Sequence, residues 1–196
     1  MGDSSTDRTT RLGAPDGSGT RDRLLDAAER VVVAHGAVGL TLEAVAADAG
    51  VSKGGLLYHF PSKDSLAAGL VERAVQRVDQ ALSRAAADQA PGSFTRAYIR
   101  VSLGPPRGRP AAGDPLSTAL LAAFALDPSL LDPLREAYAG WQQRLEDDGL
   151  RPADATLARL AVDGWWTSLV LGLPPLSPQV RRGVRDLLER LAAPRP

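Results

Sequence analysis

Residues 41–63, TLEAVAADAGVSKGGLLYHFPSK, carry the densest set of helix start and stop signals in the chain. Thr41 stands where a helix N-cap belongs, and Gly50 is placed to end that helix in a left-handed conformation. Ser52 can cap a second short helix, which Pro61 ends. Two short helices joined by a glycine-containing turn are typical of the helix-turn-helix motif, whose second helix enters the DNA major groove.

The second of these helices contains residues that are unfavourable unless the helix touches another molecule. Gly54 and Gly55 each cost about 1 kcal/mol relative to alanine inside a helix, but a bare backbone can come close to a DNA surface. Lys63 falls in the first turn of the next helix, where a positive charge opposes the helix dipole and a bound phosphate would remove the conflict. The alternative is that the two glycines form a loop and Lys63 is simply solvated.

The segment GVSKGGLLYHFPSKDSL, residues 50–66, resembles the DNA-binding domain of the TetR family of one-component transcription regulators. The resemblance covers residues 20–70 well and the remainder loosely. The chain differs from the commonest family pattern at Gly55, where the family has threonine, and at Leu57, where it has an aromatic residue. Lys53 and the backbone of the two glycines are expected to approach bases, and the other polar side chains to hold phosphates. The predicted DNA-binding residues are Thr41, Ser52, Lys53, Gly54, Gly55, Tyr58, His59 and Lys63.

Composition limits the function classes that are open to the chain. It has 196 residues, no cysteine and a formal net charge of zero, and residues 21–64 hold five basic and six acidic residues. This balance predicts weak nonspecific DNA binding, although the only two lysines, Lys53 and Lys63, both start helices of the expected DNA face. Without cysteine there is no disulfide framework or thiol chemistry. No apolar segment is long enough for a membrane span or a signal peptide, so a cytoplasmic protein is expected.

Helical periodicity continues beyond the motif and predicts an all-α fold of about nine helices. Residues 1–19 are polar and aperiodic and are predicted to form a disordered arm. The helix-turn-helix domain is expected at 20–64, and a ligand-binding and dimerisation domain at 65–196. Helices are expected at 20–35, 62–88, 93–101, 114–125, 153–172 and from 178, with a further one that opens at Asp127-Pro128 and ends at Gly149, and a loop is expected at 102–113.

Aromatic residues are concentrated in the second part of the chain, where seven of the nine lie. Pockets for organic ligands are lined by apolar and aromatic groups with a few polar ones. We therefore predict a site for a small aromatic or hydrophobic ligand, with ordinary core packing as the alternative for each aromatic residue. Flat aromatic faces suit a planar or cationic molecule, whereas Arg100 favours an anion, so the ligand charge stays open. The predicted ligand-binding residues are Tyr98, Phe124, Tyr138, Trp141, Asp163, Trp165 and Trp166.

A homodimer is predicted through residues 153–193. Small residues recur on the penultimate helix and permit close helix approach, and the last helix carries an apolar stripe that includes Leu188. A two-fold dimer also suits a protein that reads two half-sites of a palindromic operator. The resemblance to the TetR family implies the same interface. The small residues are Ala161, Gly164, Ser168 and Gly172.

The leading hypothesis is a dimeric transcriptional regulator, a repressor that a small ligand releases from its DNA operator. No catalytic residue, cofactor or metal ligand is predicted, because the chain contains no HExxH, P-loop or GxSxG motif. The alternative is an all-helical small-molecule-binding adaptor or an enzyme without specific DNA binding. The sequence leaves open the ligand, the operator and the choice between repression and activation.

Overall fold

The computed structural model of the chain describes residues 17–86, 88, 90–103, 123, 126–171 and 173–194. Over these residues the chain forms eight α-helices, two short 3₁₀ helices and no strand, which confirms the predicted all-α fold. The helices are α1 Gly17–His35, η1 Ala37–Gly39, α2 Leu42–Ala49, α3 Lys53–His59, α4 Lys63–Ala85, α5 Ser93–Leu103, η2 Pro128–Leu131, α7 Asp132–Glu146, α8 Pro152–Val170 and α9 Pro178–Leu191. Residues 1–16, the predicted loop from 104 on, most of the predicted helix at 114–125 including Phe124, and Gly172 lie outside the described residues.

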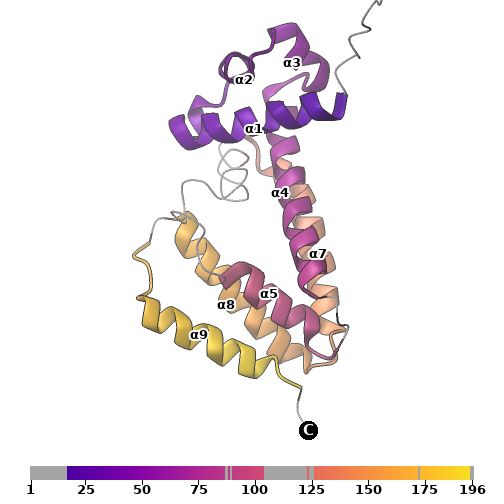
Figure 1. Cartoon of the computed structure of the whole chain (residues 1–196), viewed down its shortest axis with the longest axis vertical. Helices are drawn as coiled ribbons and strands as arrows, with labels where there is room; N and C mark the ends of the chain where they lie inside the picture. The colour runs from indigo at the N-terminus through magenta and orange to yellow at the C-terminus, as the bar shows by residue number, and fades with distance from the viewer. Residues whose placement is uncertain are drawn as a thin grey trace, which may run out of the picture.

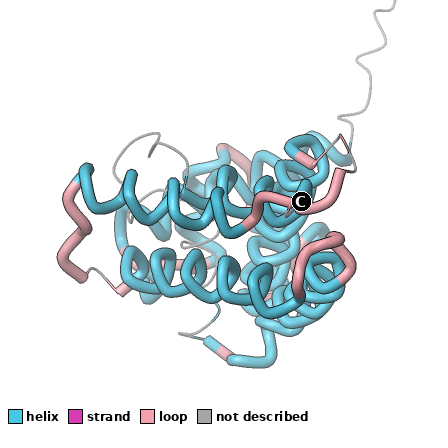
Figure 2. The backbone as a smooth tube through the Cα atoms, turned by 90° about the horizontal axis from the view of Figure 1, so that it is seen from below, coloured by secondary structure: helices cyan, strands magenta, loops and turns pink. Residues whose placement is uncertain are grey.

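Helix α4 connects the two ends of the molecule (Figure 1). Helices α1, α2 and α3 lie together at one end, and α4 leads away from them beside α7 to the other end, where α5, α8 and α9 pack. Helices α8 and α9 are neighbours in both views and are joined by the short stretch after α8 (Figures 1 and 2). A change at one end can therefore reach the other through α4.

The caps at the ends of the helices in this motif form as the sequence predicts. Thr41 Oγ1 accepts a hydrogen bond from Ala44 N at 3.1 Å and so caps α2. Gly50 ends α2 with φ of +66°, a conformation that glycine adopts without steric cost. Ser52 Oγ accepts from Gly55 N at 3.1 Å and caps α3.

Other helix boundaries differ from the predictions by a few residues. Helix α1 begins at Gly17, three residues before the predicted start at residue 20, so the end of the predicted arm is helical. Helix α4 ends at Ala85 rather than near residue 88. Helix α9 begins at Pro178 as predicted, and Ser177 caps it, with its Oγ accepting from Val180 N at 3.2 Å.

The interior divides into two apolar clusters, and α4 contributes to both. Leu66 and Leu70 of α4 belong to the first cluster, with Leu24 of α1 and Leu56 of α3. Leu82, three turns further along α4, belongs to the second cluster, which α5, α7, α8 and α9 complete. The DNA-binding end and the C-terminal end thus each have a core, with α4 as the element shared between them.

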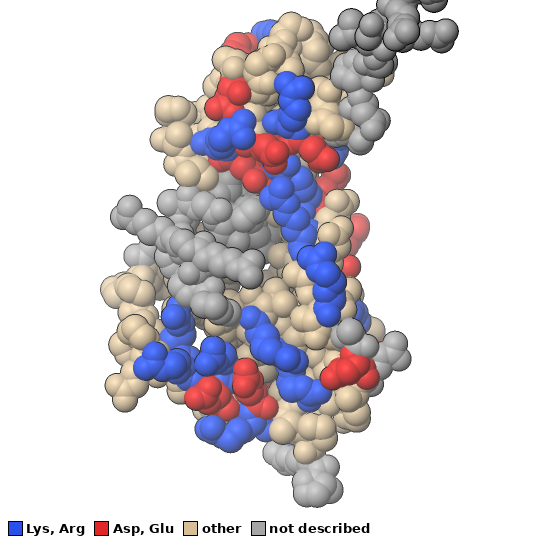
Figure 3. Space-filling model, in the orientation of Figure 1, with Lys and Arg blue, Asp and Glu red and all other residues tan. Residues whose placement is uncertain are grey.

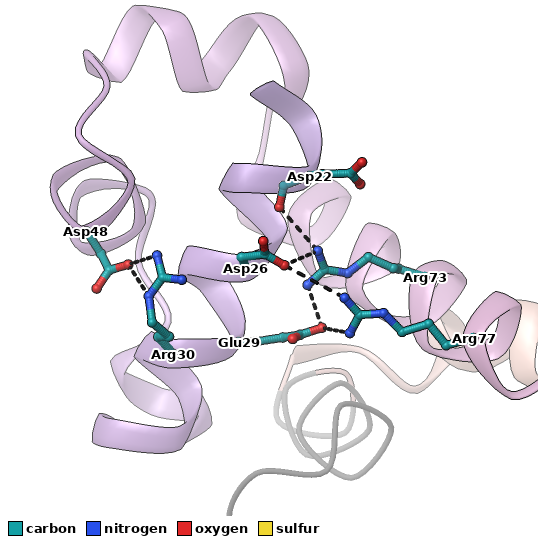
Figure 4. Close-up of polar contacts among 7 residues, drawn as sticks. All are labelled: Asp22, Asp26, Glu29, Arg30, Asp48, Arg73 and Arg77. Atoms are coloured by element: carbon teal, nitrogen blue, oxygen red, sulfur yellow. Dashed lines mark hydrogen bonds and ion pairs between the residues drawn. The ribbon is translucent and has the colours of Figure 1, made fainter. Parts of the chain in front are cut away.

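An ion-pair network ties α1 to α4 (Figure 4). Arg73 Nη1 donates to Asp26 Oδ1 at 2.7 Å and to the Asp22 carbonyl at 3.2 Å, and its Nη2 lies 2.5 Å from Glu29 Oε1. One turn along α4, Arg77 Nη1 donates to Glu29 at 2.9 Å. Because the Arg73 side chain is only 9% exposed, this network sets the angle between the two helices more firmly than a surface pair would.

Candidate functional site

The outward face of α3 is the centre of the candidate DNA interface. Leu56 points inward and is fully buried, and Phe60 follows the helix into the core at 2% exposure. The opposite face presents Lys53, Gly54 and Tyr58 to solvent, with Tyr58 84% exposed. Because so little of the Tyr58 side chain is covered, it is available to an external partner.

Lys53 is held at the start of α3 by an acidic partner on α2. Its Nζ donates to Glu43 Oε1 at 2.6 Å, and both side chains are more than half exposed. The hydrogen bond from Lys53 lowers the pKa of the Glu43 carboxyl below its usual value. Sequence reasoning missed this pair, since the two residues lie ten positions apart on different helices.

The two glycines of α3 have different environments. A Cβ at Gly55 would lie 3.3 Å from Ser52 Oγ, closer than most such contacts, whereas a Cβ at Gly54 would lie 4.0 Å from the same atom. Gly55 therefore leaves room for the Ser52 cap. Gly54 is open on its outer side, as an approach to DNA requires.

The remaining predicted DNA-binding residues surround α3. The Tyr58 and His59 rings meet edge to face at 5.1 Å between centroids. Lys63 is the first residue of α4 and, within the described part of the chain, makes no ion pair. The hydroxyl hydrogens of Thr41 and Ser52 remain available as donors, because their oxygens act as acceptors in the helix caps.

The face of the molecule in Figure 3 carries mixed charge. Basic side chains lie among acidic ones at both ends of this face. Near the motif, Arg30 pairs with Asp48 at 2.6 Å, so that arginine is already neutralised within the domain (Figure 4). Charge of this kind gives little bulk attraction to DNA phosphates, so the predicted DNA binding depends on individual side chains.

Four predicted ligand-binding residues meet in a closed cluster of the C-terminal end. Tyr98 Oη and Tyr138 Oη both donate to Asp163 Oδ1, at 2.8 and 3.2 Å, and Arg159 Nη1 donates to Asp163 Oδ2 at 2.8 Å. Burial raises the pKa of both tyrosines, that of Tyr138 to about 12. Trp141 packs against both tyrosine rings. The polar groups of this cluster satisfy one another inside the protein.

The two adjacent tryptophans divide between the two apolar clusters. Trp166 packs against the first, at the DNA-binding end of the molecule, and Trp165 against the second. The side chains of consecutive residues on a helix point about 100° apart, so two such residues rarely line the same pocket. Phe124 lies outside the described residues.

An open cavity of about 180 Å³ lies between α8 and α9. Of the predicted ligand-binding residues that the structure describes, Trp165 alone is among the lining residues. Ala161, Gly164 and Ser168, which the sequence suggested for close helix contact, line the same cavity. Their small side chains leave the space open, which the spacing along the sequence could not reveal.

Helices α8 and α9 also carry exposed apolar side chains. Leu157 and Leu160 of α8 are 55% and 54% exposed, and Val180 and Leu187 of α9 are 51% and 58% exposed. Leu188, by contrast, is 5% exposed and packs within its own chain. The expectation that Leu188 faces a partner is therefore wrong, because the helix turns it toward α5 and α8 while Leu187 points outward.

Two further properties of the described residues bear on function. They contain no group of three or more metal-ligating side chains. No helix among them has the length and apolar character needed to cross a membrane.

Comparison with known families identifies both ends of the molecule. Residues 24–70 match the family described as bacterial regulatory proteins, tetR family, and residues 92–193 match the tetracyclin repressor-like C-terminal domain. The chain belongs to the TetR family. The HTH-type transcriptional regulator RutR of Escherichia coli K12 is 32% identical over 145 residues, which cover 66% of this chain and 68% of RutR.

Solved structures agree with this assignment. A TetR-family member from Streptomyces coelicolor A3 is 30% identical, with a TM-score of 0.62 over 88% of this chain and 97% of that one. The multidrug binding protein EbrR complexed with ethidium is 28% identical, with a TM-score of 0.62 over 88% of this chain and 98% of EbrR. EbrR complexed with malachite green is 25% identical, with a TM-score of 0.59 over 87% and 96%.

These findings confirm the TetR-family reading of the sequence. The chain is a DNA-binding transcriptional regulator with a helix-turn-helix domain and a ligand-binding C-terminal domain. Its relatives indicate a transcription factor rather than an enzyme.

Proposed function

We propose that the chain is a homodimeric repressor that binds a palindromic operator and is released by a small, largely apolar aromatic ligand. The observation that carries the DNA part is the outward face of α3, where Lys53, Gly54 and Tyr58 are exposed beside Lys63 at the start of α4. Lys53 and the glycine backbone reach base edges in the major groove. Thr41, Ser52, Tyr58, His59 and Lys63 hold phosphates.

A mobility shift on the DNA that flanks the protein's own gene tests this function. The wild type should form a specific complex, and Lys63→Ala should weaken binding to all sequences alike and reduce the salt slope by about one unit per protomer. Arg84→Ala, an exposed residue in the last turn of the same helix, is the matched control and should leave the slope unchanged. A wild type without a specific complex would favour the adaptor or enzyme alternative.

The proposed dimer contact uses the exposed side chains of α8 and α9. Leu157, Leu160 and Leu187 are each more than half exposed, as expected for a face that a second copy covers. Leu187→Glu should convert the dimer to monomers in sedimentation, because it places an unpaired charge in an apolar contact. Val38→Glu changes an exposed valine at the opposite end of the molecule and should leave the dimer intact. A dimeric Leu187→Glu variant would place the interface elsewhere.

The proposed ligand binds among the aromatic residues of the C-terminal end, where Trp165 borders the open cavity. The likeness to EbrR, which was solved with ethidium and malachite green, supports planar aromatic compounds, cationic and anionic alike, as the first to screen. Binding should change tryptophan fluorescence, because all three tryptophans lie between residues 141 and 166. The same compounds should lower DNA affinity, since a ligand shifts DNA binding only by its different affinities for the two conformations.

A further inference from the structure

The open cavity between α8 and α9 is lined by apolar residues from four parts of the chain. Leu103 comes from the end of α5, Trp165 from α8, Pro174 and Leu176 from the connection, and Val184 from α9. At about 180 Å³ it is smaller than the ~300–1,000 Å³ of typical drug-sized sites. Its size and lining suit a compound of one or two fused aromatic rings rather than an extended molecule.

One charged side chain lies in this lining, and it is positive. Arg181, on the first turn of α9, is partly buried, and its guanidinium makes no ion pair or hydrogen bond with any residue that the structure describes. Among the described residues that line the cavity there is no aspartate or glutamate. An arginine beside apolar walls without an acidic partner is an anion-binding group, because its planar donors match a carboxylate.

Asp163, the acidic residue next to the cavity-lining Gly164 on α8, is engaged elsewhere. Asp163 accepts hydrogen bonds from two tyrosines and from Arg159, and the Arg159 guanidinium lies 5.9 Å from the Tyr138 ring centroid. The aromatic and acidic cluster that would attract an organic cation therefore already contains a cation of the protein itself. The sequence left the charge of the ligand open. In the described lining of the cavity the charged residue is Arg181, whose guanidinium has no ion-pair or hydrogen-bond partner there, and this favours an anionic ligand.

We propose that this cavity binds a small aromatic anion, with its carboxylate paired to Arg181 and its ring packed against Trp165 and Pro174. The proposal deepens the proposed function, on which it rests, by assigning the charge class and the place of the ligand. An occupant touches both α8 and α9, the helices of the proposed dimer contact. Ligand binding would therefore change how the two subunits, and with them the two α3 helices, are spaced on DNA.

Calorimetric titration with three probes of one shape tests the charge preference: naphthoate, neutral naphthamide and naphthylmethylammonium. Naphthoate should bind at least about tenfold more tightly than naphthamide, as a charge-assisted hydrogen bond predicts, and the cation should bind most weakly. Arg181→Gln should reduce naphthoate affinity to that of naphthamide, while Arg181→Lys should keep part of the preference. Arg182→Gln, its exposed neighbour on α9, should bind naphthoate like the wild type.

Several results would overturn the inference. The first is naphthoate binding no more tightly than naphthamide. The second is an Arg181→Gln variant that still binds naphthoate more tightly than naphthamide. The third is an Arg182→Gln variant that loses naphthoate affinity as much as Arg181→Gln does. The mobility shift distinguishes the two proposals. A specific DNA complex without Arg181-dependent binding removes only this site, and Arg181-dependent binding without a DNA complex removes only the proposed repressor function.

Discussion

Replacing Arg73 with methionine tests how the DNA-binding end is fixed to α4. The change keeps most of the side-chain length but removes the charge that lies between Asp26 and Glu29. The Arg73 side chain is 9% exposed, that of Glu29 19% and that of Asp26 49%. Without Arg73, the more buried carboxylate, Glu29, keeps Arg77 as its remaining ion-pair partner among the described residues. The variant also loses the donor to the Asp22 carbonyl.

The expected loss of stability lies below that of a fully buried pair. Removing one partner from such a pair costs about 3–5 kcal/mol, but here Arg77 still donates to Glu29 at 2.9 Å and Asp26 is half open to water. We therefore expect a loss of about 2 kcal/mol for Arg73→Met. For a chain of this size that lowers the melting temperature by about 4–8 °C.

Thermal and urea unfolding followed by circular dichroism measures this loss over the whole helical fold. Arg77→Met is the matched control, because it removes an arginine from the same network whose side chain is 45% exposed. It should cost less than about 1 kcal/mol. The reasoning is refuted if the two variants are equally stable, or if Arg73→Met is as stable as the wild type.

Two further predictions follow from packing and burial. Gly69→Ala should lower the urea midpoint, because its Cβ would lie 2.8 Å from Phe60 Cε1, and overpacking of about 1–3 kcal/mol exceeds the helix gain of about 1 kcal/mol. Gly140→Ala in α7 meets nothing within 4 Å and should raise the midpoint, so equal effects of the two alanines would contradict the packing argument. Burial raises the pKa of Tyr138 to about 12 from the ordinary tyrosine value of 10.0. The unfolded state therefore releases that proton first, and the free energy of unfolding should fall as pH rises from about 10 towards 12. That fall should be smaller in a Tyr98→Phe, Tyr138→Phe variant, and an unchanged fall would assign it to other groups.

Local signals predicted most of the helix-turn-helix correctly. The caps Thr41, Ser52 and Ser177 each bond a backbone N–H three residues ahead, and Gly50 needs only its own backbone freedom. Interactions that close over so few residues depend little on the rest of the fold. The sequence could therefore predict helix α3 and its exposed outer face. The resemblance to the TetR family implied that this helix binds DNA.

Contacts between helices were decided by tertiary structure. Lys53 and Glu43 are 10 positions apart in the sequence, and Arg73 and Asp26 are 47 positions apart. Likewise, Leu187 and Leu188 are both on the apolar side of α9 by pattern, yet the first is 58% exposed and the second 5%. Periodicity shows that a helix has an apolar side about 100° wide or more, but only the neighbouring helices determine which part of that side is covered. For the same reason the residues that line the cavity, including Arg181, could not be assembled from the sequence, because they come together only where α5, α8 and α9 meet.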